Sequence, residues 1–207
     1  LLPIFERDEV AIAAPARRPM TYGRLFHHVE RTVETLRAFG LKRNDRVAMV
    51  LPNGPEMAVG FVAVATAATC APLNPAYREN EFEFYLSDIG AKALLISSTM
   101  DSPAREVARK LNVPIIEVAA PPEVDAGTLE LAGLRQHAAG DRDLAHADDV
   151  ALVLHTSGTT ARPKIVPLTH RNVCSSAHHI SQTLDLTVHD RCLNVMPLFH
   201  IHGLIGA

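Results

Sequence analysis

A short segment rich in hydroxyl side chains carries the clearest chemical signal in the chain. Its hydroxyl residues, its glycine and its lysine are Thr156, Ser157, Gly158, Thr159, Thr160 and Lys164. Hydroxyl and backbone N–H groups donate to anionic oxygens, and a glycine lets the main chain approach an anion without an intervening Cβ. A lysine adds a compact positive charge for the outer phosphates. Because an apolar run at 150–154 precedes the segment, the pattern predicts a polyphosphate-binding loop that follows a buried strand.

Two other interpretations of this segment are less favoured. A Walker A motif needs Gly-x-x-x-x-Gly-Lys-Ser/Thr running into a helix, whereas here Pro163 precedes Lys164 and Ile165-Val166-Pro167 follows it. Lys164 is therefore expected at a loop end or a strand start. An ordinary Ser/Thr turn is the second alternative. Four hydroxyl residues among the five positions 156–160, directly after an apolar run, favour the phosphate loop over such a turn.

The segment 156–164 resembles the phosphate-binding loop of the adenylate-forming enzymes, which include acyl-CoA synthetases, luciferases and the adenylation domains of peptide synthetases. Further blocks at 45–56, 71–77 and 196–203 resemble the same family. His155, together with the segments 162–164, 166–170 and 197–204, is similar to the oxalate–CoA ligase group within it. Many relatives carry glycine where Ile165 stands, and the β-branched residue is stiffer.

The resemblance implies an ATP-dependent acyl-CoA synthetase. Such an enzyme joins a carboxylic acid to AMP with release of pyrophosphate and then transfers the acyl group to CoA, with Mg²⁺ as the metal. The acid implied is a small one, such as the dicarboxylate oxalate. An adenylation domain that loads a carrier-protein thiol and a non-catalytic nucleotide-binding relative stay open as alternatives.

The resemblance also implies roles for individual residues. Those that would hold ATP are Thr156, Ser157, Gly158, Thr159, Thr160 and Lys164. Thr156 would lie near Mg²⁺, and Lys164 and His200 would be catalytic. His200, with His202 as a weaker second, would contact the acid. Both histidines could instead be polar residues at the start of a helix near Gly203.

The later blocks of the family have no counterpart here. They include a glutamate-bearing loop near the metal, an aspartate that binds the ribose, a hinge and a small domain with a catalytic lysine. We therefore expect residues 1–207 to be an incomplete N-terminal AMP-binding domain, inactive on its own, with the rest of that domain and the small C-terminal domain absent.

Composition is typical of a globular enzyme. The 207 residues are 47% hydrophobic and carry a net charge of -3, with no basic patch for nucleic acid. No apolar run approaches the roughly 20 residues of a membrane span. Three widely spaced cysteines suggest reduced thiols and a cytoplasmic protein, with a peroxisomal location left open. The oligomeric state is open.

Strand and helix patterns alternate along the chain. Strands are predicted at 46–51, 93–96, 115–118, 150–154 and 191–195, and helices at 21–39, 55–69, 79–89, 103–111 and 169–184. A short extended piece is expected at 72–74, and 119–149 is expected to be a variable connection with one helical turn. The alternation predicts an α/β fold with a mostly parallel, doubly wound sheet flanked by helices, part of the large N-terminal domain of an adenylate-forming enzyme.

The remaining histidines carry weaker expectations. His155 is expected either to shape the adenine or acyl side of the site or to end its strand. Solvated helix faces or surface polarity account for six others, which are His27, His28, His170, His178, His179 and His189. Arg162 is expected to point into solvent at the loop tip.

Overall fold

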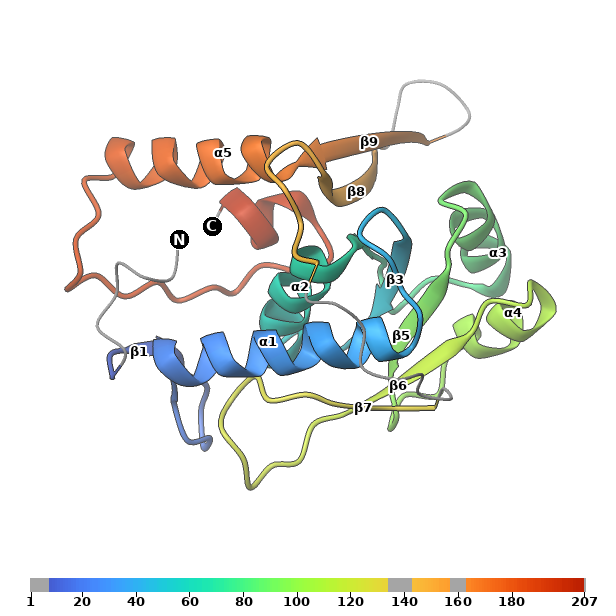
Figure 1. Cartoon of the computed structure of the whole chain (residues 1–207), viewed down its shortest axis with the longest axis horizontal. Coiled ribbons are helices and arrows are strands. Elements are labelled where there is room, and N and C mark those ends of the chain that lie inside the picture. The colour runs from blue at the N-terminus through green and yellow to red at the C-terminus, as the bar shows by residue number, and fades with distance from the viewer. Residues whose placement is uncertain (1–7, 134–142, 157–162, 207) are drawn as a thin grey trace.

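The computed structural model describes residues 8–133, 143–156 and 163–206 (Figure 1). Ser157, Gly158, Thr159, Thr160 and Arg162 of the predicted phosphate loop lie outside the described residues. None of the helices within the described ranges combines the length and apolarity that crossing a membrane requires.

The described residues form one large sheet of seven strands in the order β7-β6-β5-β3-β4-β8-β9. Its strands are β3 (Arg46–Val50), β4 (Thr69–Pro72), β5 (Ala93–Ser97), β6 (Ile115–Ala119), β7 (Glu130–Ala132), β8 (Val150–Thr156) and β9 (Lys164–Thr169). The inner five pair in parallel, and β7 and β9 run antiparallel at the two edges. A small separate hairpin joins β1 (Val10–Ile12) to β2 (Met20–Thr21).

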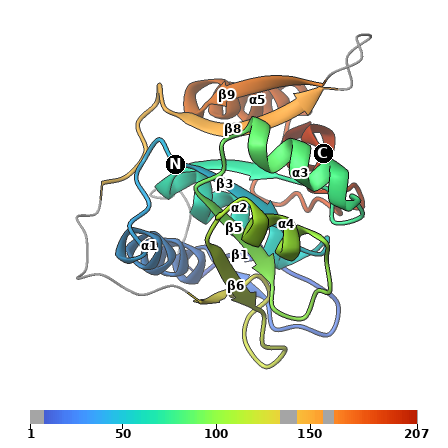
Figure 2. The same ribbon diagram turned by 90° about the vertical axis from the view of Figure 1, so that its right-hand side faces the viewer.

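Helices cover both faces of the sheet (Figures 1 and 2). They are α1 (Tyr22–Ala38), α2 (Pro55–Ala67), α3 (Glu79–Asp88), α4 (Ala104–Lys110) and α5 (His170–Thr183), followed by the π-helical turn η2 (His202–Gly206). Thr21 caps α1 by accepting a hydrogen bond from the backbone N–H of Arg24 at 3.4 Å. Four apolar residues at helical spacing bury the inner face of α1, namely Leu25, Val29, Val33 and Leu36.

The two cores follow from the alternation of side chains along each strand. In β3, Val47 and Met49 pack in the core that includes α1 and α2, whereas Ala48 and Val50 pack in the core that includes α3 and α4. Parallel strands buried on both faces read as continuous apolar runs, which β3 and β5 do. The predicted α/β fold with a mostly parallel, doubly wound sheet is therefore confirmed.

Several predicted boundaries were wrong. The helix expected at 55–69 ends at Ala67, and the residues from Thr69 to Pro72 form the inner strand β4, so the extended piece begins earlier than expected. The alanine-rich sequence favours helix, but burial between β3 and β8 decides for a strand. The connection 119–149 contains the edge strand β7.

The strand expected at 191–195 was also wrong. This segment has no regular structure, and Leu193 and Val195 are 86% and 75% exposed. Alternating apolar residues form a strand only where a neighbouring strand accepts their backbone hydrogen bonds. The sheet of the described residues has none beside this segment.

Candidate functional site

Thr156 and Lys164, the two described ends of the predicted phosphate loop, face each other across a hairpin. They are directly opposed at the end of the antiparallel β8–β9 ladder, and both side chains are exposed. Directly opposed residues of antiparallel strands project from the same face of a sheet. The structure therefore brings the Thr156 hydroxyl and the Lys164 ammonium group to one face, and Lys164 begins a strand as expected.

This hairpin end lies at the carboxyl edge of the parallel strands. Val47 of β3 is opposite Cys70 of β4, and Cys70 is opposite Leu152 of β8. Leu51 and Thr156 lie equally many residues beyond the paired positions Val47 and Leu152, so both lie at the same edge of the sheet. The chain reverses its direction of progression around β3, since β4 and β5 flank it on opposite sides. Doubly wound sheets bind ligands at the carboxyl edge beside such a reversal.

Asn53, in the loop after β3, fixes the segment that carries His200. Its side-chain amide donates to the carbonyl of Met196 at 3.3 Å, and its oxygen accepts from the N–H of Leu198 at 2.8 Å. The Asn53 side chain thus supplies the donor and the acceptor that a neighbouring strand would supply, to a segment more than 140 residues further along the chain. Asn194 adds hydrogen bonds to the carbonyl of Gly203 at 2.6 Å and from the N–H of Met196 at 2.9 Å.

His200 follows directly in the turn that these asparagines hold. Its N–H donates to the carbonyl of Pro197 at 3.2 Å, and its own carbonyl accepts from Leu204 at 3.0 Å. Gly203 packs so closely on the carbonyl of Pro197 that a Cβ would collide with it. The imidazole of His200 is exposed. The predicted helix start near Gly203 is present as the π-helical turn.

His202 lines a cavity of about 350 Å³ between β9, α5 and the π-helical turn. The cavity wall comprises Leu168, Asn172, Val173, Ser176, Ile201, His202, Ile205 and Gly206. Leu168 lies on the same face of β9 as Lys164, because the two positions are separated by an even number of residues. The cavity therefore opens on the face of the hairpin that presents Thr156 and Lys164, and it offers a few polar groups on mostly apolar walls.

His155 lies on the opposite face of β8. Its Nε2 is 2.9 Å from a carboxylate oxygen of Asp88, at the end of α3, and its ring contacts the ring of Tyr85 edge-on at 4.6 Å between centroids. Since successive side chains of a strand alternate between faces, His155 and Thr156 point apart. His155 is thus the last residue but one of β8 and has a specific partner on α3.

Two histidines are less solvated than expected. His28 is half-buried and its Nε2 accepts the N–H of Leu129 at 3.0 Å. Burial, aided by the nearby charge of Arg31, lowers the pKa of His28, in keeping with this acceptor role. His170 Nε2 lies 3.0 Å from the carbonyl of Ala65, which ties α5 to α2. For these two residues the interpretation as solvated surface was wrong, because residues distant in sequence cover them.

The three cysteines behave as expected of unpaired thiols. Cys70 is fully buried in β4, and Cys174 and Cys192 are exposed and free. Burial raises the pKa of the Cys70 thiol far above its ordinary range, so this thiol stays protonated.

Sequence reasoning missed three residues that organise this edge: Asn53, Asn194 and Asp88. Asn53 lies within the block 45–56 that resembles the family, but its partners are distant in the chain. Asp88 is a polar residue among the apolar positions of α3, and the sequence shows no sign that it faces β8. No local pattern reveals contacts of this range.

The hairpin that presents Thr156 and Lys164 therefore belongs to an α/β protein with a doubly wound sheet, and it lies at the edge where such proteins commonly bind ligands. A family model for AMP-binding enzymes matches residues 5–207. The chain therefore belongs to the AMP-binding enzyme family, which confirms the resemblance noted in its sequence.

Individual relatives agree with this family. The chain is 42% identical to the oxalate–CoA ligase of Arabidopsis thaliana over 205 residues, which cover 96% of this chain and 39% of the relative. It is 38% identical to the oxalate–CoA ligase of Saccharomyces cerevisiae, over 79% of this chain and 34% of the relative. Among solved structures, ATP-bound MatB from Rhodopseudomonas palustris superposes with a TM-score of 0.78 at 26% identity, covering 97% of this chain and 39% of MatB. The chain thus spans about two fifths of the length of the first of these relatives.

Proposed function

We propose that the full-length protein is an ATP-dependent acid–CoA ligase, of which residues 1–207 form the first part of the N-terminal AMP-binding domain. The single observation that supports this function is the opposition of Thr156 and Lys164 at the carboxyl edge of the sheet, in a chain related to CoA ligases. The coverage of about two fifths of the Arabidopsis relative supports the domain assignment.

The chemistry asks this chain to hold a triphosphate. A carboxylate is a poor electrophile, but attack of its oxygen on the α-phosphate of ATP gives an acyl-adenylate and pyrophosphate. The thiol of CoA then displaces AMP from the acyl group. Little covalent chemistry is required of the protein, which positions the reactants and offsets the charge that grows on the leaving pyrophosphate.

Lys164 and the residues 156–160 divide this task in our proposal. The exposed ammonium group of Lys164 neutralises the outer phosphates, and hydroxyl and N–H groups of residues 156–160 donate to phosphate oxygens. The hydroxyl of Thr156 is a hard oxygen ligand that would help to hold Mg²⁺, and the ion when bound would offset negative charge on the phosphates. Within the described ranges no group of three His, Cys, Asp or Glu residues could hold a metal, so Thr156 would act together with the phosphates.

We propose a small dicarboxylate such as oxalate as the acid. The names of the two relatives support this choice, and so does His202, which offers a donor at the wall of the cavity beside α5. Asn172 and Ser176 supply further polar groups on that wall. His200, exposed in the adjoining turn, is the second proposed contact with the acid.

A pyrophosphate-release screen of the full-length protein tests the proposed function. Short dicarboxylates, aromatic acids and fatty acids are offered with ATP and Mg²⁺, with and without CoA. We expect release that depends on a short dicarboxylate and an acyl-CoA product when CoA is present. Release of pyrophosphate without transfer to CoA would instead indicate a carrier-loading enzyme, and no release with any acid would overturn the proposal.

Replacement of Lys164 tests the role of the hairpin. Lys164→Ala should lower the rate of acyl-adenylate formation about 100-fold, the usual scale for loss of one group that stabilises developing charge. Lys42→Ala is the matched control, since Lys42 is an exposed lysine that precedes β3 at the opposite edge of the sheet. Equal rates for Lys164→Ala and wild type would contradict the role.

A further inference from the structure

His155 is held between a carboxylate and an aromatic ring, immediately before Thr156. Its Nε2 lies 2.9 Å from Asp88 Oδ2, and its side chain is only 6% exposed. A carboxylate only accepts hydrogen bonds, so Nε2 carries the proton whether the ring is neutral or charged. The tautomer and the orientation of the ring are thereby set by Asp88.

The aromatic contacts fix the same ring from a second direction. Tyr85 meets His155 edge-on at 4.6 Å between centroids, and Phe84 lies at 6.1 Å. Tyr85 is itself stacked on Tyr77 at 4.7 Å. His155 therefore cannot swing away from α3 without losing both a hydrogen bond and ring contacts.

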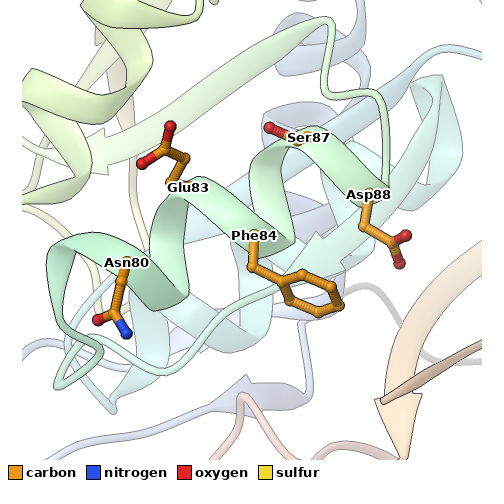
Figure 3. Close-up of a pocket in the computed structure, with 5 residues that line it drawn as sticks. All are labelled: Asn80, Glu83, Phe84, Ser87 and Asp88. Atoms are coloured by element: carbon orange, nitrogen blue, oxygen red, sulfur yellow. The ribbon is translucent and has the colours of Figure 1, made fainter. Parts of the chain in front are cut away.

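Asp88 is poorly placed for the helix that carries it. It is the last residue of α3, where the helix dipole disfavours a negative charge, and the last turn of α3 contains no basic residue. Figure 3 shows Asp88 and Phe84 projecting from the same side of α3, at the rim of a surface hollow of about 520 Å³. His155, which belongs to β8, donates a hydrogen bond that stabilises the negative charge of Asp88.

The pair acts on the strand at the point where the candidate loop begins. His155 faces α3, and Thr156, the next residue, faces the other side of the sheet with Lys164 opposite. An anchored side chain fixes the backbone of its own residue, and hence the direction in which the next residue points. The Asp88–His155 contact therefore anchors β8 one residue before Thr156, at the end of the β8–β9 ladder.

We propose that Asp88 and His155 are positioning residues that hold the end of β8, and with it Thr156, from behind the sheet. This inference rests on the proposed function, because it assigns the pair to Thr156, one of the residues that would hold the β- and γ-phosphates. Neither residue contacts the nucleotide. Loss of the pair should therefore weaken binding of ligands with a triphosphate and leave binding of AMP unchanged.

Calorimetric binding of a non-hydrolysable ATP analogue and of AMP to the full-length protein tests the proposal. His155→Phe keeps an aromatic ring against Tyr85 but removes the donor, and Asp88→Ala removes the acceptor. Each should raise the Kd of the analogue about fivefold, the scale of one partly exposed hydrogen bond to a charged group, with AMP binding within twofold of wild type. His155→Gln, whose amide can still donate to Asp88, should restore most of the affinity.

The matched control is Glu83→Ala on the same helix. Glu83 forms an ion pair with Lys110 of α4 at 2.9 Å, so this change breaks a contact of α3 that does not involve β8. It should leave the Kd of both ligands unchanged. A thermal unfolding midpoint for every variant identifies any that fails to fold, and Asp88→Leu, which also lacks an acceptor, then replaces Asp88→Ala.

The possible failures are distinguishable. If wild type binds the analogue and His155→Phe binds it equally well, the positioning role is overturned while the proposed function stands. If His155→Phe weakens binding of the analogue and of AMP equally, the pair supports the nucleotide site as a whole rather than Thr156 in particular. The proposal is then again overturned. If wild type binds no ATP analogue, the proposed function itself fails.

Discussion

Single side chains connect segments that lie far apart in this chain. Asn53 satisfies a donor and an acceptor of the 196–198 segment, Asp88 holds His155, and His170 reaches Ala65. In each contact, one of the two segments contains a candidate site residue or lies next to one. The position of His200 thus depends on an amide that belongs to the loop after β3.

Replacement of Asn53 tests this dependence. Asn53→Ala removes both hydrogen bonds and should reduce the turnover of the full-length protein about 30-fold, because two net hydrogen bonds of about 1 kcal/mol each no longer hold the turn. Asn53→Asp keeps the acceptor for Leu198 but loses the donor to Met196. Its turnover should lie between those of wild type and Asn53→Ala. Pyrophosphate release at saturating ATP measures the effect.

The control for Asn53 is Asn44→Ala, an asparagine in the turn before β3 at the other edge of the sheet. It should retain wild-type turnover. Full activity of Asn53→Ala would show that the turn around His200 holds its geometry without this amide.

At the scale of elements, the N-terminus of α5 is held by reciprocal hydrogen bonds between two side chains and the backbone. None of its residues is fully buried. Thr169 accepts from the N–H of Asn172 at 3.2 Å, and the side-chain oxygen of Asn172 accepts from the N–H of Thr169 at 3.0 Å. This capping box fixes the first turn of a helix that supplies Asn172 to the cavity wall.

Thr169→Ala should therefore lower the free energy of unfolding by about 1 kcal/mol. Ser175→Ala, an exposed change in the middle of α5, is the control and should be neutral or slightly stabilising, because alanine has the higher helix propensity. Denaturant titration measures both. An equal loss for the two variants would mean that the cap contributes nothing specific.

Local patterns at this scale predicted most elements and misplaced those decided by distant neighbours. The apolar spacing of Leu25, Val29 and Val33 and the cap at Thr21 suffice to find α1, since both signals lie within the helix. The strand β4 was missed because Thr69 and Cys70 continue an alanine-rich helical sequence, and only burial between β3 and β8 makes them a strand. Thr156 and Lys164, the ends of the predicted phosphate loop, could be found from the sequence because their signal, like that of α1, lies within one short segment. Asn53 and Asp88 act through contacts with distant segments, which no local pattern contains.

At the scale of the whole molecule, Asp125 ties the N-terminal region to the connection after β6. It forms ion pairs with Arg18 and with Arg24, the latter at 2.7 Å, and it is only 7% exposed. Burial opposes ionisation of this carboxyl, but hydrogen bonds from Arg24 and Arg18 outweigh it and lower the pKa of Asp125 below its ordinary value. The folded protein therefore keeps this charge at a pH where the unfolded chain has lost it.

The sign of the pH dependence follows. A carboxyl with a lowered pKa stabilises the fold fully above the unfolded pKa, about 3.9, and this stabilisation is lost as the pH falls through the lower folded value. Asp125→Asn should cost about 1 kcal/mol of unfolding free energy at pH 7. The difference from wild type should shrink below about pH 4.

Asp148→Asn is the matched control for Asp125→Asn. Asp148 also pairs with an arginine, Arg171, at 2.8 Å, but its side chain is 81% exposed. Exposed pairs contribute little, so this variant should follow the wild-type stability at every pH. A constant difference between Asp125→Asn and wild type from pH 7 to pH 3 would rule out the charge as its cause.

The hairpin of β8 and β9 has a mechanical consequence. Thr156 and Lys164 are joined through an unbroken run of paired positions from Leu152 to Thr156, whereas β8 meets β4 at Leu152 opposite Cys70. The separation of Thr156 and Lys164 is therefore set within the β8–β9 hairpin. A rotation of the hairpin against the central strands would therefore move Thr156 and Lys164 together, and the separation of their backbones would stay constant.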